Sequence, residues 1–171
     1  MSGAEGQLRA GIRAGTALFC AALLFLGVAL PVSAGPAEIK REGVVRWVID
    51  GDTFELANGE RVRLIGINTP EHTPWKHRVD FYGKEAAWYA RGLLTGKKVL
   101  LARDARLRDK YGRTLAYVYM ENGDFVNKRL VEEGYARASH YAPNGRYRRV
   151  FAEAEQRARQ AQKGLWSRRT R

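Results

Sequence analysis

The chain has 171 residues, with 30 lysines and arginines against 18 aspartates and glutamates and a formal net charge of +12. Its only cysteine, Cys20, lies in an apolar stretch near the amino terminus, so the rest of the chain has no thiol for catalysis, disulfides or metal binding. The positive excess favours polyanionic partners, either nucleic acid or anionic lipid.

Residues 1–34 have the order of an export signal. Arg9 and Arg13 precede an uncharged apolar run over residues 17–30, and small residues follow it up to Ala34. Cleavage after Ala34 would release one domain as a secreted or periplasmic protein, because the remaining chain is long enough for one core and too short for two. The alternative is an uncleaved membrane anchor that holds the domain outside the cytoplasm, because no charge occurs between Arg13 and Glu38 and that span is long enough to cross a bilayer.

The strand pattern begins at Gly43, and residues 35–42 before it are predicted to form a short linker. Five segments combine β-branched residues with alternating apolar positions, the pattern of strands with one buried face. Asn58-Gly59, between the second and third segments, is a strong signal for a two-residue hairpin. The predicted strands are residues 44–49, 53–56, 61–67, 98–102 and 114–120.

Three segments with apolar residues at helical spacing are predicted to be helices, each followed closely by a glycine. A polar loop over residues 71–81 precedes the first of them. Short strands with helices between and after them predict an α+β, mainly β fold: a five-stranded Greek-key barrel of the oligonucleotide/oligosaccharide-binding (OB) type. The domain is expected over residues 43–167, followed by a basic tail at 168–171. The predicted helices are residues 84–94, 125–133 and 147–163.

Oxygen-bearing side chains gather at two predicted loop ends. Asp52 lies in an Asp-Gly-Asp-Thr turn after the first strand, and Asn68 and Thr69 follow the third strand. Hard cations such as Ca²⁺ take carboxylate, amide and main-chain carbonyl oxygens as ligands, and these three residues can provide them. They are therefore candidate calcium ligands.

Two arginines and one glutamate supply the other groups that phosphodiester hydrolysis needs. Arg63 and Arg113 are candidates to hold a phosphate from two sides, because a guanidinium binds phosphate bidentately and stays charged. Glu71, just after a turn stiffened by proline, is a candidate to orient or deprotonate the attacking water. Each segment is weak alone, since short motifs match by accident, so the prediction depends on their combination.

Between about Val44 and Trp166 the chain resembles the staphylococcal (micrococcal) nucleases. Several independent motifs occur in the order of that family, which makes the resemblance specific. These motifs are Asp50-Gly51-Asp52-Thr53, Arg63 on its strand, Thr69-Pro70-Glu71, Tyr82-Gly83, Asp109-Lys110-Tyr111-Gly112-Arg113, Leu115-Ala116-Tyr117-Val118-Tyr119, Val126-Asn127, Leu130-Val131, Gly134-Tyr135-Ala136 and Gly164-Leu165-Trp166.

The resemblance implies a calcium-dependent endonuclease that hydrolyses DNA and RNA. It implies that single-stranded substrate is favoured and that the products end in a 3′-phosphate. Asp52 is then a carboxylate ligand of one calcium ion, and Thr69 lends its backbone carbonyl. No obligate protein partner is inferred, and a monomer is expected.

The resemblance also implies roles for the residues around the phosphate. Arg63 and Arg113 are expected to bind and stabilise it, with Glu71 acting as the general base or water positioner. Lys110 and Tyr111 are expected to lie against the nucleotide, with Tyr111 stacking on it or donating a hydrogen bond to phosphate. These five residues and the calcium ligands make up the predicted site.

One position departs from the family pattern. The second metal aspartate of the family is Asn68 here, whose amide oxygen still ligates Ca²⁺ but brings no negative charge, so weaker calcium binding is expected. The segment Ala138-Ser139-His140-Tyr141 also differs, because family members often carry a pair of tyrosines there near the nucleotide base.

Two other functions compete with the nuclease. A non-catalytic OB module would bind single strands without cutting them, but such a module is expected to lose the arginines or the glutamate, and Arg63, Glu71 and Arg113 are all present. A protein that uses its charge on a lipid surface explains the basic balance and leaves the carboxylates unexplained. The sequence therefore favours the enzyme over both.

Overall fold

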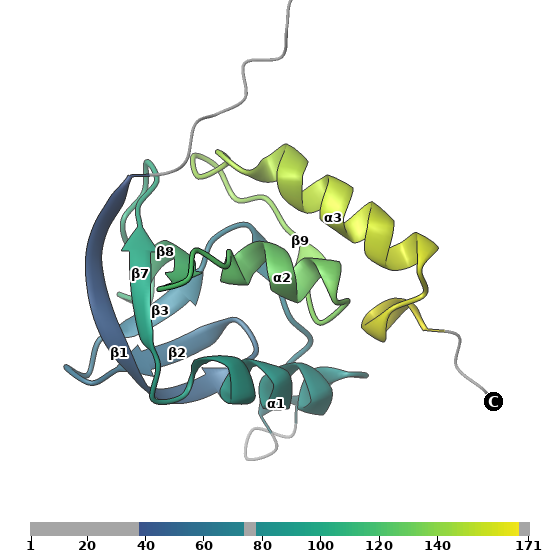
Figure 1. Ribbon diagram of the computed structural model, residues 1–171, viewed down its shortest axis with the longest axis horizontal. Coiled ribbons are helices and arrows are strands. Elements are labelled where there is room, and N and C mark those ends of the chain that lie inside the picture. Colours follow the sequence, from purple (N-terminus) through teal and green to yellow (C-terminus); the bar gives the residue numbers. More distant parts are fainter. Residues whose placement is uncertain (1–37, 74–77, 168–171) are drawn as a thin grey trace, which may run out of the picture. The chain divides into compact units, whose positions relative to one another are not determined.

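The computed structural model describes residues 38–73 and 78–167 (Figure 1). The predicted export signal or anchor at 1–34, residues 35–37 of the predicted linker and the predicted basic tail at 168–171 lie outside the described residues, whereas residues 39–42 of that linker belong to the first strand. Among the helices that the structure does describe, none is long and apolar enough to cross a membrane.

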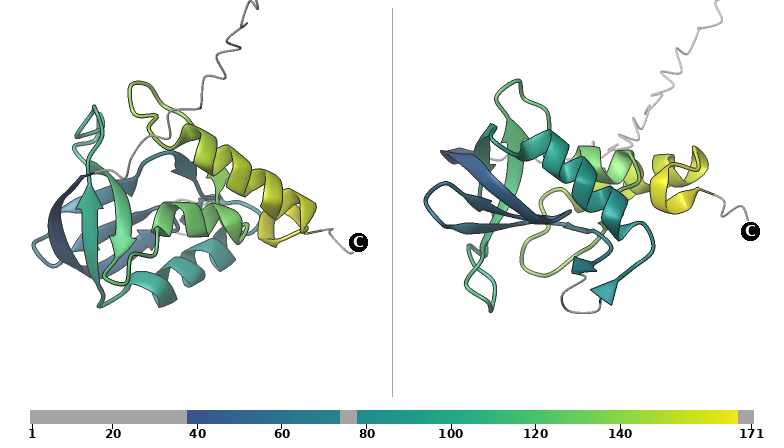
Figure 2. Two further views of the ribbon diagram at one scale, coloured as in Figure 1. Left: turned by 45° about the horizontal axis from the view of Figure 1, so that its top comes forward. Right: turned by 90° about the horizontal axis from the view of Figure 1, so that it is seen from below.

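Five strands close into a barrel in the order β1, β2, β3, β8, β7. The first three form an antiparallel meander, β3 pairs in parallel with β8, and β7 pairs antiparallel with both β8 and β1. The left view of Figure 2 shows the strands curling around one interior. This confirms the predicted five-stranded, OB-type α+β fold. The strands are β1 (Ile39–Asp50), β2 (Thr53–Leu56), β3 (Arg61–Leu64), β7 (Lys98–Ala102) and β8 (Thr114–Met120).

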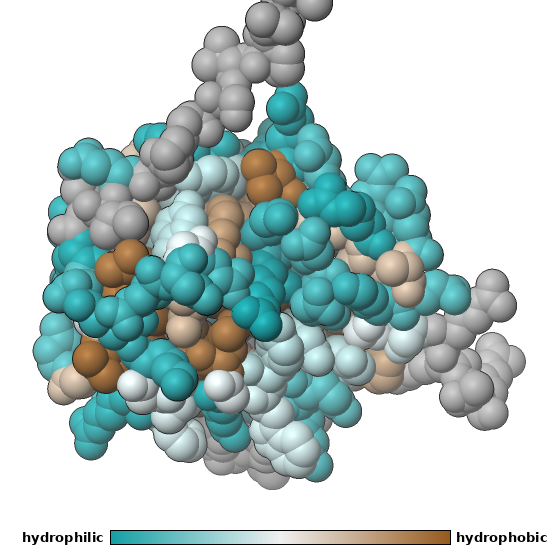
Figure 3. All heavy atoms as spheres, viewed as in Figure 1, coloured by the Kyte–Doolittle hydropathy of each residue, from teal (hydrophilic) through white to brown (hydrophobic). Residues whose placement is uncertain are grey.

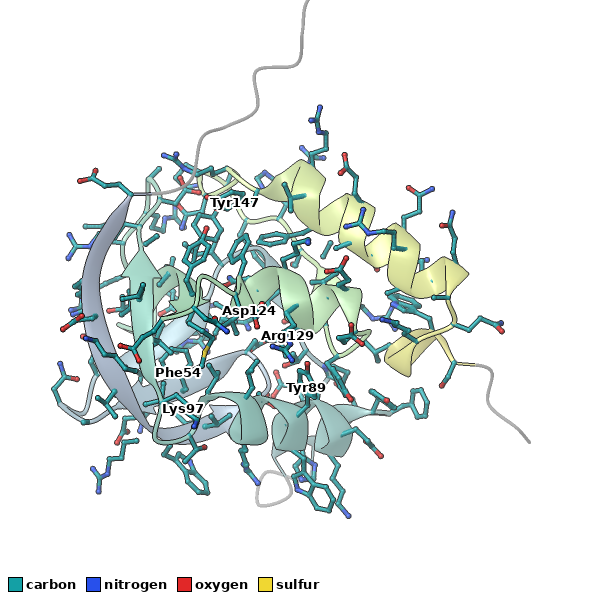
Figure 4. All side chains as sticks on the ribbon, in the orientation of Figure 1. Phe54, Tyr89, Lys97, Asp124, Arg129 and Tyr147 are labelled. Atoms are coloured by element: carbon teal, nitrogen blue, oxygen red, sulfur yellow. The ribbon has the colours of Figure 1, made fainter. Side chains whose placement is uncertain are left out.

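The barrel closes because alternate residues of each strand are apolar and point inward. Phe54 on β2, labelled in Figure 4, is fully buried, as are Val62 on β3 and Val99 on β7. Burying each such side chain contributes roughly 1.5 to 3 kcal/mol relative to leaving it exposed. The alternate residues of the same strands therefore form the outer face of the barrel, and the face in Figure 3 is mostly hydrophilic.

Three helices lie beside the barrel in Figure 1. Figure 4 shows the junction of the first two, where Arg129 Nε donates to the hydroxyl of Tyr89 at 2.9 Å and the same arginine pairs with Asp124. These contacts join helices that the sequence pattern predicts to within three residues at each end. The helices are α1 (Gly83–Leu94), α2 (Val126–Glu132) and α3 (Arg148–Gln160), followed by the short 3-10 helix η2 (Gly164–Trp166).

The predicted third strand, residues 61–67, is broken in the structure. The chain turns at Gly66, which has a φ of 78°, so that β3 ends at Leu64 and a separate strand, β4 (Ile67–Asn68), begins. A Cβ atom at Gly66 would lie 2.4 Å from the ring of Phe151 on α3. The strand therefore ends at a position that packs against α3, although the apolar pattern of the sequence continues past it.

Three further short strands were not predicted from the sequence. The polar loop after Thr69 contains β5 (His72–Thr73) paired with β6 (Arg78–Val79), and β9 (Arg137–Ala138) pairs with β4. The first strand also starts earlier than predicted, because Ile39 already pairs with β7. The pairing of β4 with β9 and the early start of β1 depend on segments far along the chain, whereas β5 and β6 form a local ladder within one loop.

Candidate functional site

A cavity of about 560 Å³ opens at the end of β1 and the start of β2, beside β3. It brings together six residues that the sequence predicts to act in one site: Asp52, Arg63, Asn68, Glu71, Tyr111 and Arg113. Thr69 and Lys110 do not line it. The other lining residues are Ile49, Asp50, Thr53 and Arg61.

Asp52 ties the two loop ends of the site together. Its side chain is buried, and Oδ1 accepts a hydrogen bond from the Thr53 hydroxyl at 3.0 Å. Oδ2 accepts one from the backbone N–H of Thr69 at 2.8 Å and pairs with Arg63. A buried carboxylate needs such partners, so Asp52 holds the loop after β4 against the turn after β1.

Arg63 lies on the outer face of β3 and reaches both side chains that are predicted to ligate calcium. It pairs with Asp52, and its Nη2 donates to Asn68 Oδ1 at 2.8 Å and to the Ile67 carbonyl at 3.2 Å. Burial lowers the pKa of Arg63 to about 10, and the nearby positive charge of Arg113 also lowers it. The guanidinium therefore stays charged at neutral pH.

Arg113 approaches the cavity from the loop between β7 and β8, which Asp109 shapes. Asp109 Oδ1 accepts from the backbone N–H groups of Tyr111 and Arg113 at 2.9 and 3.0 Å, and Oδ2 accepts from Arg113 Nε at 2.6 Å. Burial acts to raise the pKa of Asp109, but these hydrogen bonds outweigh it and lower the pKa below its ordinary value. The carboxylate thus fixes the direction of the Arg113 guanidinium, whose Nη1 lies 3.4 Å from the Thr53 hydroxyl.

Glu71 is held in place through its backbone. Its N–H donates to Asp80 Oδ2 at 3.0 Å, and its carbonyl accepts from the Asp80 N–H at 2.8 Å. A Cβ atom on Gly83, the first residue of α1, would lie 2.3 Å from the same carbonyl. The start of α1 therefore packs directly on the backbone of Glu71, and this close approach requires glycine.

A second cavity of about 390 Å³ shares Arg63, Tyr111 and Arg113 with the first. The exposed rings of Tyr111 and Tyr141 line it together with apolar side chains, and exposed aromatic rings are surfaces on which nucleobases stack. Lys110 lines this cavity rather than the first, and its Nζ lies 5.0 Å from the centre of the Tyr111 ring. The apolar lining residues are Leu64, Ile65, Ile67 and Leu115.

Residues 61–168 match the family model described as staphylococcal nuclease homologue. The chain belongs to this family. It is 40% identical to the thermonuclease of Staphylococcus intermedius over 142 residues, which cover 81% of this chain and 84% of that protein. It is 36% identical to the thermonuclease of Staphylococcus hyicus over 167 residues, 91% of this chain and 98% of that protein. Endonuclease YncB of Bacillus subtilis (strain 168) is 39% identical over 124 residues, 70% of this chain and 58% of that protein.

The family resemblance inferred from the sequence is thus confirmed, and this staphylococcal nuclease homologue contains oxygen donors suited to a hard cation. Within residues 38–73 and 78–167, no cluster of three or more His, Cys, Asp or Glu side chains is arranged to hold a metal. The calcium ligands predicted from the sequence are instead the carboxylate of Asp52, the amide oxygen of Asn68 and the backbone carbonyl of Thr69. Because Ca²⁺ accepts carboxylate, amide and carbonyl oxygens, this donor set fits calcium and does not suit a thiophilic metal.

Thr69 follows the cavity residue Asn68 and is buried. It is 1% exposed, its hydroxyl oxygen has no hydrogen-bond partner, and its N–H is bound to Asp52. An unsatisfied buried hydroxyl costs free energy, so its persistence here is consistent with a site whose polar groups serve a ligand. Asn68, in contrast, is exposed. Within the described residues, its side chain accepts a hydrogen bond from Arg63 alone.

Sequence reasoning missed Asp50 and Tyr141. Asp50 lines the first cavity, and burial raises the pKa of its carboxyl, as does the negative charge of Glu71. It is the first acid of the same Asp-Gly-Asp turn as Asp52, a signal that was present in the sequence. Tyr141 lies in the segment that departs from the family pattern, and the sequence assigned it no role, whereas in the structure it lines the second cavity together with Tyr111.

Proposed function

We propose that this protein is an exported, calcium-dependent endonuclease that hydrolyses DNA and RNA, favours single strands and leaves 3′-phosphate ends. Nuclease activity, and hence hydrolysis of nucleic acid esters, is supported by its family and by relatives named thermonuclease and endonuclease. The observation that carries the proposal is one cavity that holds Arg63, Arg113 and Glu71 together with several oxygen donors.

In this proposal the side chains divide the chemistry of hydrolysis. Glu71 orients or deprotonates the attacking water. Arg63 and Arg113 bind the phosphate and stabilise the negative charge that grows on it as the five-coordinate phosphorane forms. Asp109 acts as a positioning residue, because it accepts one hydrogen bond from the backbone N–H of Arg113 and one from Nε of its guanidinium. The bond from phosphorus to the 5′ oxygen then breaks, and the 5′ oxygen takes a proton from solvent water as it leaves the cavity.

Asp52, Asn68 and the backbone carbonyl of Thr69 are proposed to hold one calcium ion. Bound calcium supplies Lewis acidity and positive charge at a phosphate oxygen. Arg63 contacts Asp52 and Asn68, so the arginine and the bound cation would contact the same two side chains. Changes at Arg63 are therefore expected to alter calcium dependence as well as phosphate binding.

The second cavity supports a preference for single strands. A base that enters it must leave the stack of a duplex, which is easiest in single-stranded or frayed substrate. Tyr111 and Tyr141 offer ring faces to such a base, and Lys110 offers a cation to the neighbouring phosphate. None of these contacts distinguishes ribose from deoxyribose, in agreement with activity on both DNA and RNA.

The test is incubation of the domain with single-stranded DNA or RNA, in calcium or in excess chelator. Cleavage in calcium and intact strands in chelator are expected, with products that carry a 3′-phosphate. A non-catalytic OB module is the competing candidate, favoured by the fold alone. Strands that are bound but intact in both conditions would support that module and reject the enzyme.

Calcium dependence is expected to report on Asn68. The Asn68→Asp change adds an anionic ligand of similar reach, so it is expected to lower the calcium concentration for half-maximal rate by about tenfold. Titration of calcium against initial rate in both forms is the measurement. Asn58→Asp, at the hairpin tip between β2 and β3, adds the same charge outside the cavity. It is expected to leave the calcium concentration for half-maximal rate unchanged. Equal calcium requirements for Asn68→Asp and the parent would remove Asn68 from the metal site.

Export is the remaining part of the proposal. The uncharged run over residues 17–30 behind Arg9 and Arg13 supports a cleaved signal. The proposed product is a single secreted or periplasmic domain without an obligate protein partner. Mass spectrometry of the exported protein is expected to find a chain that starts near Gly35. An intact leader in washed membranes would instead support a membrane-anchored enzyme whose domain faces outward.

A further inference from the structure

Two tryptophans on the outer surface have no part in the site described above. Trp47 on β1 is 52% exposed, and Trp88 on α1 is 58% exposed. Each ring lies next to a cation, because the Arg91 guanidinium carbon is 5.0 Å from the centre of Trp47 and Lys84 Nζ is 4.4 Å from the centre of Trp88. We call these four side chains the tryptophan surface.

The tryptophan surface is continuous because α1 packs against β1, as the right view of Figure 2 shows. Lys84, Trp88 and Arg91 follow one another at spacings of four and three residues, so they lie along one face of the helix. Arg91 completes the link to the sheet, since it covers Trp47 and its Nε lies 3.4 Å from the Val48 carbonyl. Aromatic rings and cations therefore alternate from the helix to the sheet.

The same surface extends to the catalytic cavity across the outer face of the sheet. Arg61 on β3 lines that cavity and pairs in register with Glu55 on β2, which pairs with Trp47 on β1. Glu55 between them is flanked by Arg61 and Arg46, at 3.8 and 3.6 Å. Neighbouring strands lie about 4.8 Å apart, so Trp47 is about 10 Å from Arg61.

We propose that the tryptophan surface binds the part of a single-stranded substrate that continues past the cleavage site. The proposal rests on the proposed nuclease function, because the strand is taken to leave the cavity beside Arg61. Indole faces stack on bases of any sequence, and Lys84, Arg91 and Arg61 attract the phosphates between them. Each cation covers one side of a ring, and more than half of each tryptophan remains open to a base.

The chemistry of this surface favours a nucleic acid strand over a lipid bilayer. A protein surface that inserts into a bilayer gathers its apolar side chains into one face. Here the two indoles alternate with cations along a line, which matches the alternation of bases and phosphates in an extended strand. The line also begins at the cavity proposed to hold the scissile phosphate.

The experiment uses one short and one long substrate. A dinucleotide occupies the cavity alone, whereas a single strand of about fifteen nucleotides also reaches the tryptophan surface. Trp88→Ala is expected to lower kcat/KM for the long strand by about tenfold and to leave the dinucleotide unchanged, whereas Trp88→Phe retains a ring and most of the rate. Alanine is the best helix former, so this exposed substitution keeps α1 intact.

A comparison of two lysine variants tests whether the cations of the tryptophan surface bind the strand. Lys84→Gln is expected to weaken binding of the labelled long strand in chelator, measured by fluorescence anisotropy, and to reduce the salt slope by about 0.7. Lys128→Gln removes the same charge from α2, away from the tryptophan surface, and is expected to leave that slope unchanged. Because chelator prevents turnover, this measurement does not depend on catalysis.

The outcomes separate the two proposals. Equal effects of Trp88→Ala on both substrates, or no effect on either substrate, overturn the binding role of the surface. The binding role is also overturned if Trp88→Ala loses binding to anionic lipid vesicles while its binding to the single strand stays unchanged. If the parent cleaves neither substrate, the nuclease proposal fails, and the anisotropy comparison of Trp88→Ala and Lys84→Gln with the parent still decides whether the surface binds single strands.

Discussion

Replacing Arg63 or Arg113 by lysine is expected to lower turnover of single-stranded DNA by about a hundredfold to a thousandfold, with the fold intact. Lysine keeps the charge but cannot offer two parallel donors to the phosphate. Initial rates at saturating calcium, together with thermal unfolding curves, are the measurements. Near-parental rates in either variant would remove that arginine from the site.

The two arginine variants are also expected to differ in their calcium dependence. Arg63 contacts Asp52 and Asn68, whereas Arg113 is held by Asp109 and reaches Thr53. Arg63→Lys is therefore expected to shift the calcium concentration for half-maximal rate, and Arg113→Lys is expected to leave it unchanged.

A control variant accounts for general effects of exchanging arginine for lysine. Arg157→Lys exchanges an exposed arginine on α3 that pairs with Glu132, outside both cavities, and is expected to retain the parental rate. A similar shift in calcium dependence in Arg63→Lys and Arg113→Lys would contradict the proposal that Arg63 and the cation contact the same side chains, Asp52 and Asn68.

The Glu71→Gln variant is expected to lose about a hundredfold to ten-thousandfold in turnover while it still binds single strands. Glutamine keeps the shape of the side chain but cannot accept the proton of the attacking water. Lys110, Tyr111 and the positive charge of the domain do not depend on Glu71, so binding persists at low salt and weakens as salt rises. The measurements are single-turnover rates and strand retention across a salt series.

Glu153→Gln provides the matched control for charge. It removes one exposed carboxylate from α3, and both rate and binding are expected to match the parent. Loss of strand binding in Glu71→Gln would contradict the division between residues that bind the strand and the residue that activates water.

Much of the barrel was predictable because its signals are local. The strands at residues 53–56, 98–102 and 114–120 were predicted with the bounds that the structure has, since alternating apolar residues and turn dipeptides mark them. Prediction was wrong where a distant residue decides, as at Gly66, where the ring of Phe151 requires a turn within an apolar run.

The sequence by itself determined the family, the barrel and the residue types of the site, because motif order and hydrophobic period are properties of neighbouring residues. Only the tertiary structure decided which of them meet. Asp52 bonds to Thr69 across 17 positions and Arg113 approaches Thr53 across 60, and both contacts exist because the barrel closes. The tryptophan surface was missed for the same reason, because Arg91 on α1 meets Trp47 on β1 from a segment far along the chain, which no local pattern specifies.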